Sequence, residues 1–219
     1  MLAMLMITQC MLIMDRNSSI YIGFMVGLFC INAELQAGMI DKDGMEPWEV
    51  CGMCHSLDGV SKMPKFPKLA GQKAAYLTLQ LADFRHERRT NDNGQMASIV
   101  TEINPLDIES IVGYFSGLPR PAPESIIEEG VEKAGHQTGK LLFEEGRPGV
   151  DACSSCHNLV HPTAPFLQAQ HADYIRKQLN DFKQGHRVGS RAAVMTGIAG
   201  LLSGDEIDAV ADYLQSSGR

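Results

Sequence analysis

The sequence contains no run of basic residues. Acidic side chains outnumber Lys and Arg by 26 to 19 over 219 residues, which gives a formal net charge of −7, and both signs are spread along the chain. Proteins bind a phosphate backbone mainly through clustered Lys and Arg side chains. The composition therefore excludes nucleic acid as a partner. A hydrophobic content of 44% also excludes a disordered chain and suffices for one large globular domain or two small ones.

No apolar segment reaches the roughly 20 residues that cross a bilayer as a helix. The amino terminus instead has two shorter apolar stretches on either side of a polar break at 15–19. We expect residues 1–37 to hold a secretory signal peptide that starts at Met14 and is cleaved after Ala33 or Ala37. An uncleaved anchor is the alternative. The leader predicts export to the periplasm, with peripheral membrane association as a second possibility.

Cysteines are also few outside this leader, and they follow a repeated pattern. Four of the six lie in the segments Cys51-Gly52-Met53-Cys54-His55 and Cys153-Ser154-Ser155-Cys156-His157. Both segments match Cys-x-x-Cys-His, the attachment motif for c-type haem. Two cysteines three positions apart lie on one face of a helical turn, where both can form thioethers to the haem vinyl groups. The histidine that follows is then placed as the proximal iron ligand. We therefore expect two covalently bound haem c groups.

Other chemistries also use paired cysteines. A zinc knuckle, a thioredoxin-like redox pair or a single four-cysteine zinc site would each be compatible with an isolated Cys-x-x-Cys. The two copies here both continue with histidine, and each stands within its own repeat. That combination favours haem over the alternatives.

The repeat extends well beyond the cysteines. Residues of the first copy recur at an offset of 98, namely Pro67 as Pro165, Gln72 as Gln170, Tyr76 as Tyr174, Gln80 as Gln178, Asp83 as Asp181, Phe84 as Phe182 and Arg89 as Arg187. Such self-similarity indicates two copies of one domain. We assign 38–118 to the first repeat, the proline-rich and then acidic segment 119–135 to a linker, and 136–219 to the second repeat.

Both repeats have the pattern of helices. Tyr76, Leu77, Gln80 and Phe84 follow the spacing of one buried helix face, as do their counterparts. The tyrosines are interpreted as core residues without a redox role. Ser203 and Glu206 form a capping box that predicts the start of the last helix, and Asn104 with Pro105 marks the matching helix of the first repeat. The predicted fold class is all-α, with two tandem helical domains, each around one covalent haem.

A haem iron with one histidine needs a sixth ligand or has an open site. Met96 lies 41 residues beyond His55, and Met195 lies 38 residues beyond His157, at matching places in the two repeats. A thioether opposite histidine raises the reduction potential. We expect these methionines to be the distal ligands, since Met63 stands only 8 residues past its histidine. The other histidines do not recur and are expected at the surface: His86, His136, His161, His171 and His186. Of these, His161 and His171 remain alternatives to Met195.

The sequence resembles the tandem dihaem cytochromes c, most closely the cytochrome c4 family, over 50–117 and 139–218. The most specific segments are Pro-Lys-Phe-Pro-Lys-Leu-Ala-Gly-Gln at 64–72 and Gly-Val-Asp-Ala-Cys at 149–153. The second repeat departs from the pattern, because the stretch from His157 to Pro162 is shortened and lacks the usual glycine-rich turn and the Lys-Leu-Ala-Gly run.

The resemblance implies two helical cytochrome c folds packed as a pair, with Met96 and Met195 as distal ligands. It also implies that the carbonyls of Pro67 and Pro165 accept a hydrogen bond from the proximal histidines, which orients the imidazole rings. Two six-coordinate haems leave no iron site for a substrate, so we expect an electron-transfer protein and not an enzyme.

Redox proteins are the expected partners. The resemblance implies a quinol-oxidising complex as donor and a terminal oxidase as acceptor. A cytochrome subunit of a dehydrogenase complex is the alternative within the same class, and a haem peroxidase, which would need one iron without its sixth ligand, belongs to a different class.

The two motifs predict two haems per chain when the protein is matured in an exporting host. Thioether bonds are covalent, so both haems should survive acid-organic extraction, and pyridine haemochrome quantification should give a ratio of two. Replacing Cys153 and Cys156 with alanine should reduce that ratio to one. Protein that contains zinc, or one haem before any substitution, would contradict the prediction.

Overall fold

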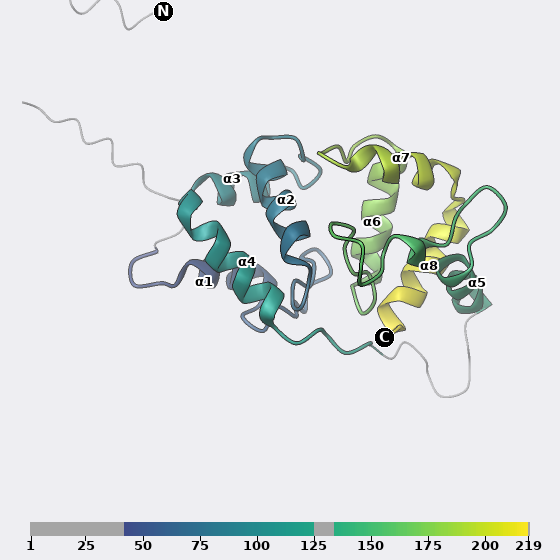
Figure 1. Ribbon diagram of the computed structural model, residues 1–219, viewed down its shortest axis with the longest axis horizontal. Helices are drawn as coiled ribbons and strands as arrows, with labels where there is room; N and C mark the ends of the chain where they lie inside the picture. Colours follow the sequence, from purple (N-terminus) through teal and green to yellow (C-terminus); the bar gives the residue numbers. More distant parts are fainter. Residues whose placement is uncertain (1–41, 125–133, 219) are drawn as a thin grey trace, which may run out of the picture. The chain divides into compact units, whose positions relative to one another are not determined.

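The computed structural model describes residues 42–124 and 134–218, which belong to one compact unit (Figure 1). The predicted signal or anchor segment, 1–37, lies outside these residues, as does most of the predicted linker. Apart from one isolated bridge between Arg147 and Val150, the regular elements of the described residues are all helices. The all-α prediction is confirmed.

The first repeat contains four α-helices and one 3₁₀ turn. They are α1 (Pro47–His55), α2 (Ala74–Arg85), α3 (Gln95–Thr101), η1 (Pro105–Asp107) and α4 (Ile108–Gly117). The second repeat contains α5 (Ala134–Glu144), η2 (Cys153–Ser155), α6 (Ala172–Lys183), α7 (Ala192–Leu201) and α8 (Gly204–Ser216). Helices α2 to α4 thus have α6 to α8 as counterparts. Helix α5 begins at Ala134, which lies inside the segment predicted as linker.

Side-chain caps define several of these starts. The Ser203 hydroxyl accepts a hydrogen bond from the Glu206 amide while the Glu206 carboxylate accepts one from the Ser203 amide, so the predicted capping box is present. Asn104 accepts from the Leu106 amide, but this cap begins η1, and α4 follows from Ile108. Pro105 suits the first position of η1, because the amide hydrogen that proline lacks has no helical partner there.

Each repeat has its own apolar core, and each core reaches one cysteine of a haem motif. In the first repeat, Leu77 from α2 packs with Ile111 and Phe115 from α4, and the half-buried Cys51 lies against this cluster. In the second repeat, Cys153 packs against the corresponding cluster of α6 and α8, which includes Ile175, Ile207, Val210 and Leu214. The first cysteine of each motif is therefore anchored to a packed interior.

Helices α5 and α8 approach closely where α5 carries a glycine. A Cβ built on Gly139 would stand 2.1 Å from the Ala209 carbonyl oxygen, an atom of the α8 backbone that cannot rotate away. Gly113 of α4 has nothing within 4 Å of the same position. The two glycines therefore differ in what a side chain would meet.

Gly139→Ala should destabilise the haem-loaded protein by about 1–3 kcal/mol, because the methyl group forces the two helices apart. Gly113→Ala is the matched control and should be neutral or stabilising by up to about 1 kcal/mol, since alanine favours a helix interior. Chemical unfolding followed by circular dichroism measures both. Equal effects of the two substitutions would contradict the close packing of α5 on α8.

Candidate functional site

The two cysteine motifs occupy different local structures. The first lies at the carboxyl end of α1, whereas the second lies on the short 3₁₀ turn η2 and the bends after it. Cys51 and Cys153 are half-buried, and Cys54 and Cys156 are exposed. All four thiols are free. The described residues include no group of three or more His, Cys, Asp or Glu side chains that could hold a metal ion, so the four cysteines do not form a common zinc site.

Both motif histidines are buried and make the same hydrogen bond. Nδ1 of His55 lies 2.8 Å from the Pro67 carbonyl oxygen, and Nδ1 of His157 lies 2.8 Å from that of Pro165. Burial lowers the pKa of both imidazoles, which favours the neutral form. A neutral ring that donates through Nδ1 keeps a lone pair on Nε2. Each ring is therefore oriented and in the tautomer that a metal ligand requires.

The two predicted methionines lie in corresponding helices and are half-buried. Met96 is in the first turn of α3, where its amide donates a hydrogen bond of 2.5 Å to Asp92. Met195 is in α7 and packs with Phe182, Ala192 and Ala199. Both helices pack against the helix that precedes them, α2 or α6.

The remaining histidines differ from their prediction in one case. His86 and His186 are exposed, as expected, and His136 and His161 are half-buried. His171 was expected at the surface, but it is only 4% exposed, because its Nε2 donates to the Ser61 carbonyl of the first repeat at 2.8 Å. Nδ1 of His161 accepts from the Ala164 amide at 3.0 Å. Each of the two alternatives to Met195 therefore has one ring nitrogen hydrogen-bonded to the backbone.

The loop after each motif is held differently in the two repeats. In the first, the Gly59 carbonyl accepts hydrogen bonds from the amides of Leu69 and Ala70, at 2.8 and 3.1 Å. The shorter second loop has no such glycine turn. Its Asn158 side chain accepts from the amides of Val160 and His161, and it donates back to Ser155. An asparagine turn therefore replaces the glycine turn.

A polar network that sequence reasoning missed joins the repeats. Arg89 donates to Gln80 of its own repeat and to Tyr174 and Gln178 of the other, while Arg187 donates to Gln178 and then to Tyr76 and Gln80. These tyrosines were interpreted as ordinary core. Each tyrosine hydroxyl in fact accepts a hydrogen bond from an arginine of the opposite repeat. The signal was available, because the same polar residues recur on one helix face at the offset of 98.

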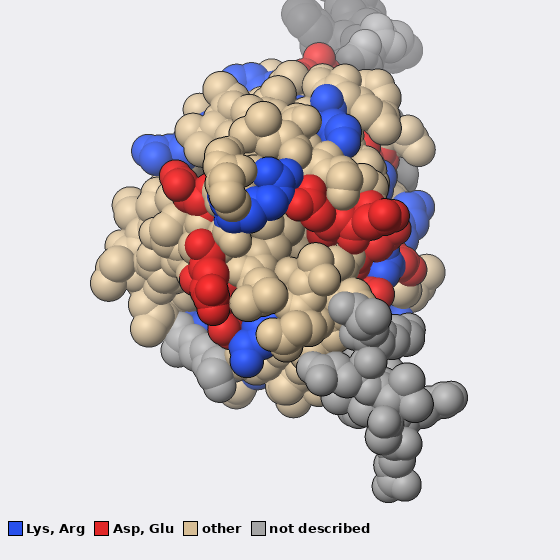
Figure 2. Space-filling model, turned by 90° about the vertical axis from the view of Figure 1, so that its right-hand side faces the viewer, with Lys and Arg blue, Asp and Glu red and all other residues tan. Residues whose placement is uncertain are grey.

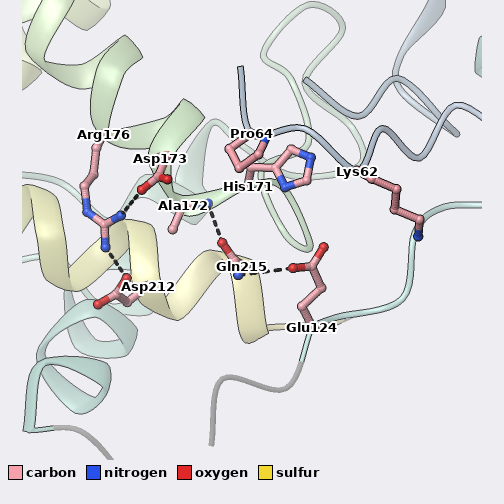
Figure 3. Close-up of a pocket in the computed structure, with 9 residues that line it drawn as sticks. All are labelled: Lys62, Pro64, Glu124, His171, Ala172, Asp173, Arg176, Asp212 and Gln215. Atoms are coloured by element: carbon pink, nitrogen blue, oxygen red, sulfur yellow. Dashed lines mark hydrogen bonds and ion pairs between the residues drawn. The ribbon is translucent and has the colours of Figure 1, made fainter. Parts of the chain in front are cut away.

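A cavity of about 510 Å³ is lined by no residue of the two haem motifs. Lys62, Pro64 and Glu124 line it from one side and residues of α6 and α8 from the other (Figure 3). Its charged groups are largely paired with each other, since Arg176 binds Asp173 and Asp212 and the Gln215 amide donates to Glu124. No motif cysteine lines it, and His171 is the ligand candidate that does.

No protein-family model matches the chain. Cytochrome c4 of Pseudomonas aeruginosa is 35% identical over 177 residues, which cover 76% of this chain and 83% of that protein. Cytochrome c4 of Thiocapsa roseopersicina is 35% identical over 188 residues, which cover 82% and 91%. The chain belongs to the cytochrome c4 family.

A solved structure agrees with this assignment. Reduced recombinant cytochrome c4 from Pseudomonas stutzeri matches with a TM-score of 0.65 at 33% sequence identity, covering 76% of this chain and 93% of that one. A further relative is a thiosulfate dehydrogenase electron acceptor of Stutzerimonas stutzeri, 31% identical over 176 residues, which cover 77% of this chain and 79% of that protein. Cytochrome c4 proteins transfer electrons and are not enzymes, so the prediction of an electron carrier is confirmed.

Cytochrome c4 proteins carry two covalent haem c groups, and this chain has both attachment motifs. The residues present fit two such groups. Each motif combines two free thiols with a buried imidazole whose Nε2 is available. Large apolar side chains beside the motifs are exposed in the polypeptide alone, as expected of groups that a haem macrocycle covers: Met53, Leu57, Met63, Leu159 and Val160.

The cytochrome c4 relatives are periplasmic c-type cytochromes. In the part of this chain that the structure describes, no helix is both long enough and apolar enough to cross a membrane.

Proposed function

We propose that the chain is a periplasmic one-electron carrier in which each repeat holds one haem. The hydrogen bond from His55 to Pro67, repeated from His157 to Pro165, is the observation that carries this proposal. Residues 38–118 form the first haem domain and 136–219 the second, joined by the linker 119–135. Residues 1–37 direct export, either as a cleaved signal peptide or as an anchor that keeps the protein at the membrane.

The attachment residues in this proposal are the four motif cysteines. Cys51 and Cys54 form the thioethers of the first repeat, and Cys153 and Cys156 those of the second. Packing of the first cysteine of each pair into a core supports the assignment, because it ties the attachment point to the rigid part of its repeat.

The axial ligands in this proposal are one histidine and one methionine in each repeat. His55 with Met96 would hold the first haem iron, and His157 with Met195 would hold the second. When bound, the haem iron supplies the ferric and ferrous couple that carries the electron. The protein holds the imidazole rings through Pro67 and Pro165, excludes water from the buried histidines, and leaves no ligand position open to a substrate.

The partners in this proposal are redox proteins. A quinol-oxidising complex donates electrons and a terminal oxidase accepts them. A second candidate is the electron acceptor of a dehydrogenase, and the relative named for thiosulfate dehydrogenase supports it. Purification of the native complex after gentle crosslinking separates the two, since a copurifying dehydrogenase indicates the second role and an oxidase indicates the first.

Met96→Ala should open the first iron and Met195→Ala the second, while the other haem stays low-spin. The altered haem should lose its weak sulfur-to-iron absorption band and fall in potential, within the roughly 0.8 V range that axial ligands span. Visible spectroscopy and a redox titration measure both effects. Met45→Ala is the matched control, because this methionine precedes α1 and is assigned no contact with either haem, and it should change neither.

Two outcomes would contradict this ligation. If Met195→Ala left the spectrum and potential unchanged while His161→Ala or His171→Ala altered them, two histidines would ligate the second haem. If the unaltered reduced protein bound carbon monoxide, one iron would have an open site, and the peroxidase alternative would replace the carrier.

Partner docking should depend only modestly on salt. The part from residue 35 to 118 has 8 basic and 11 acidic residues, and 119–219 has 10 and 13, so the two halves have a similar net charge and no strong charge dipole runs between them. On the face in Figure 2, acidic and basic side chains lie next to each other. Raising the ionic strength from about 0.01 to 0.15 M shortens the Debye length from about 30 to 8 Å. The electron-transfer rate should fall by less than about tenfold over that range, and a steeper loss in stopped-flow kinetics would contradict the prediction.

A further inference from the structure

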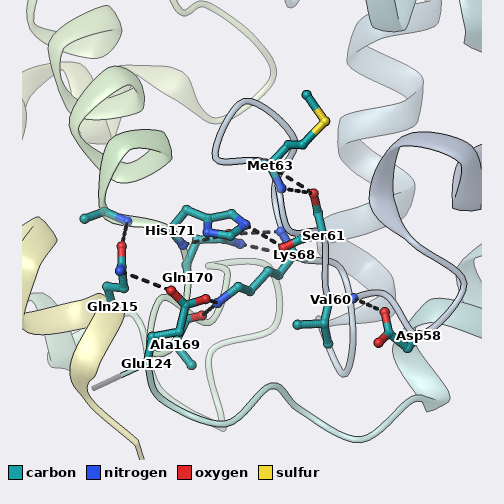
Figure 4. A network of polar contacts seen from close by, with 11 residues as sticks. Asp58, Val60, Ser61, Met63, Lys68, Glu124, Ala169, Gln170, His171 and Gln215 are labelled. Carbon is teal, nitrogen blue, oxygen red and sulfur yellow. Dashed lines mark hydrogen bonds and ion pairs between the residues drawn. The ribbon is translucent and has the colours of Figure 1, made fainter. Parts of the chain in front are cut away.

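The peptide group that accepts the His55 hydrogen bond is held from the other repeat. Its carbonyl, that of Pro67, lies 2.8 Å from Nδ1 of His55. Its amide hydrogen, on Lys68, is donated to Oε1 of Gln170 at 2.9 Å (Figure 4). The Gln170 side chain also donates through Nε2 to the Lys68 carbonyl at 2.9 Å. One peptide therefore connects the histidine of the first repeat with a glutamine of the second.

The second repeat has the same arrangement in the opposite direction. The Pro165 carbonyl lies 2.8 Å from Nδ1 of His157, and the amide of the same peptide, on Phe166, donates to Oε1 of Gln72 at 2.9 Å. Gln72 also donates to the Phe166 carbonyl at 3.0 Å. The glutamines and the prolines recur at the offset of 98, and Lys68 and Phe166 occupy equivalent positions after the prolines. Two equivalent contacts argue against a chance hydrogen bond.

The residue after each glutamine holds the adjoining loop. Lys73 donates to the carbonyls of Asn158 and His161, each at 2.5 Å, and His171 donates to that of Ser61 at 2.8 Å. Lys73 and His171 are the N-cap residues of α2 and α6. The first residues of α2 and α6 therefore form hydrogen bonds with the opposite repeat, in the segment between its haem histidine and its proline.

Burial strengthens the electrostatic effect of these hydrogen bonds. Gln72 and Gln170 are each 8% exposed and Lys68 is 3% exposed, so water competes little for these groups. A peptide whose N–H donates a hydrogen bond has a more negative carbonyl oxygen, and linked hydrogen bonds in a buried site polarise one another. A more negative proline oxygen strengthens the bond from Nδ1 and makes the imidazole a stronger electron donor, which favours the oxidised iron.

We propose that Gln72 and Gln170 are positioning residues that tune the reduction potential of the haem in the opposite repeat. Gln170 acts on the first haem through the Pro67–Lys68 peptide, and Gln72 acts on the second through the Pro165–Phe166 peptide. The contact of the two repeats is then part of each redox centre. This inference rests on the proposed function, because it takes His55 and His157 as iron ligands.

The test is a redox titration of four glutamine variants of the full haem-loaded chain. Gln170→Met removes the acceptor opposite the Lys68 amide, and it should raise the potential of the first haem, changing its reduction equilibrium by about twofold or more. Gln72→Met should do the same to the second haem alone. Gln170→Glu and Gln72→Glu keep an acceptor at the same place, so the affected potential should return to the unaltered value or fall below it.

Comparing methionine with glutamate at one position shows whether the glutamine tunes the reduction potential or only supports the loop. If Gln170 merely held the loop in place, methionine and glutamate would shift the potential in the same direction, which would overturn the proposal. The Nδ1 proton of the proximal histidine in the reduced protein, observed by nuclear magnetic resonance, should move in Gln170→Met for His55 only. Ser190→Ala is the control, because it removes a 2.5 Å hydrogen bond to Asp83 between the repeats without touching either proline peptide, and it should leave both potentials unchanged.

Failure of the proposed function would be visible in the unaltered protein. Spectra without two haems of histidine and methionine ligation would refute that function before any glutamine is replaced. Two results would overturn the inference alone, provided that the spectra are normal. The first is that the reduction potentials do not change in the methionine variants. The second is that the potential changes for the haem in the same repeat as the altered glutamine.

Discussion

The hydrogen bond between a buried imidazole and a proline carbonyl is the interaction on which both sites depend. A buried ring must pair its N–H, because an unpaired donor away from water is costly. Donation from Nδ1 of His55 to Pro67 meets this need and leaves Nε2 as the metal-binding atom. The local sequence brings the histidine beside its two cysteines. The position of the proline depends on the loop between them and on what that loop packs against.

The two repeats reach this bond along different paths. Twelve positions separate the histidine from its proline in the first repeat and eight in the second. Gly59 organises the longer loop through its carbonyl, and Asn158 organises the shorter one through its side chain. The distance at the end of each path is nevertheless 2.8 Å. The acceptor position is therefore the conserved feature of the repeat, and the loop that supplies it is free to vary.

Buried polar contacts join the two repeats. Arg89 and Arg187 each reach across to a tyrosine and a glutamine, and Gln72 and Gln170 pair with backbone groups. Buried polar groups require specific partners in a specific geometry, whereas apolar surfaces tolerate sliding. An interface of this kind determines the mutual orientation of the repeats. It also couples that orientation to the loops that hold the haem histidines.

Local features were predictable from the sequence. The attachment motifs lie within five consecutive residues, so their chemistry follows from spacing alone, and the fixed offset between copies revealed the repeat. Helix periodicity placed α2 and α6, and the Ser203 and Glu206 pair marked the start of α8, because these signals act within a few residues. The start of α4 was less accurate, since a 3₁₀ turn precedes it.

Only the tertiary structure decided which partners the recurring polar residues meet. The sequence determined that Gln72, Tyr76 and Arg89 recur, but a periodic pattern reports that a face is covered and not what covers it. His171 was expected at the surface but is buried. The Ser61 carbonyl to which it donates lies 110 positions away, so the sequence around His171 does not indicate this contact. The bond from Lys68 to Gln170 spans 102 positions. Contacts at such separations arise from the docking of two folded repeats, and no local propensity encodes them.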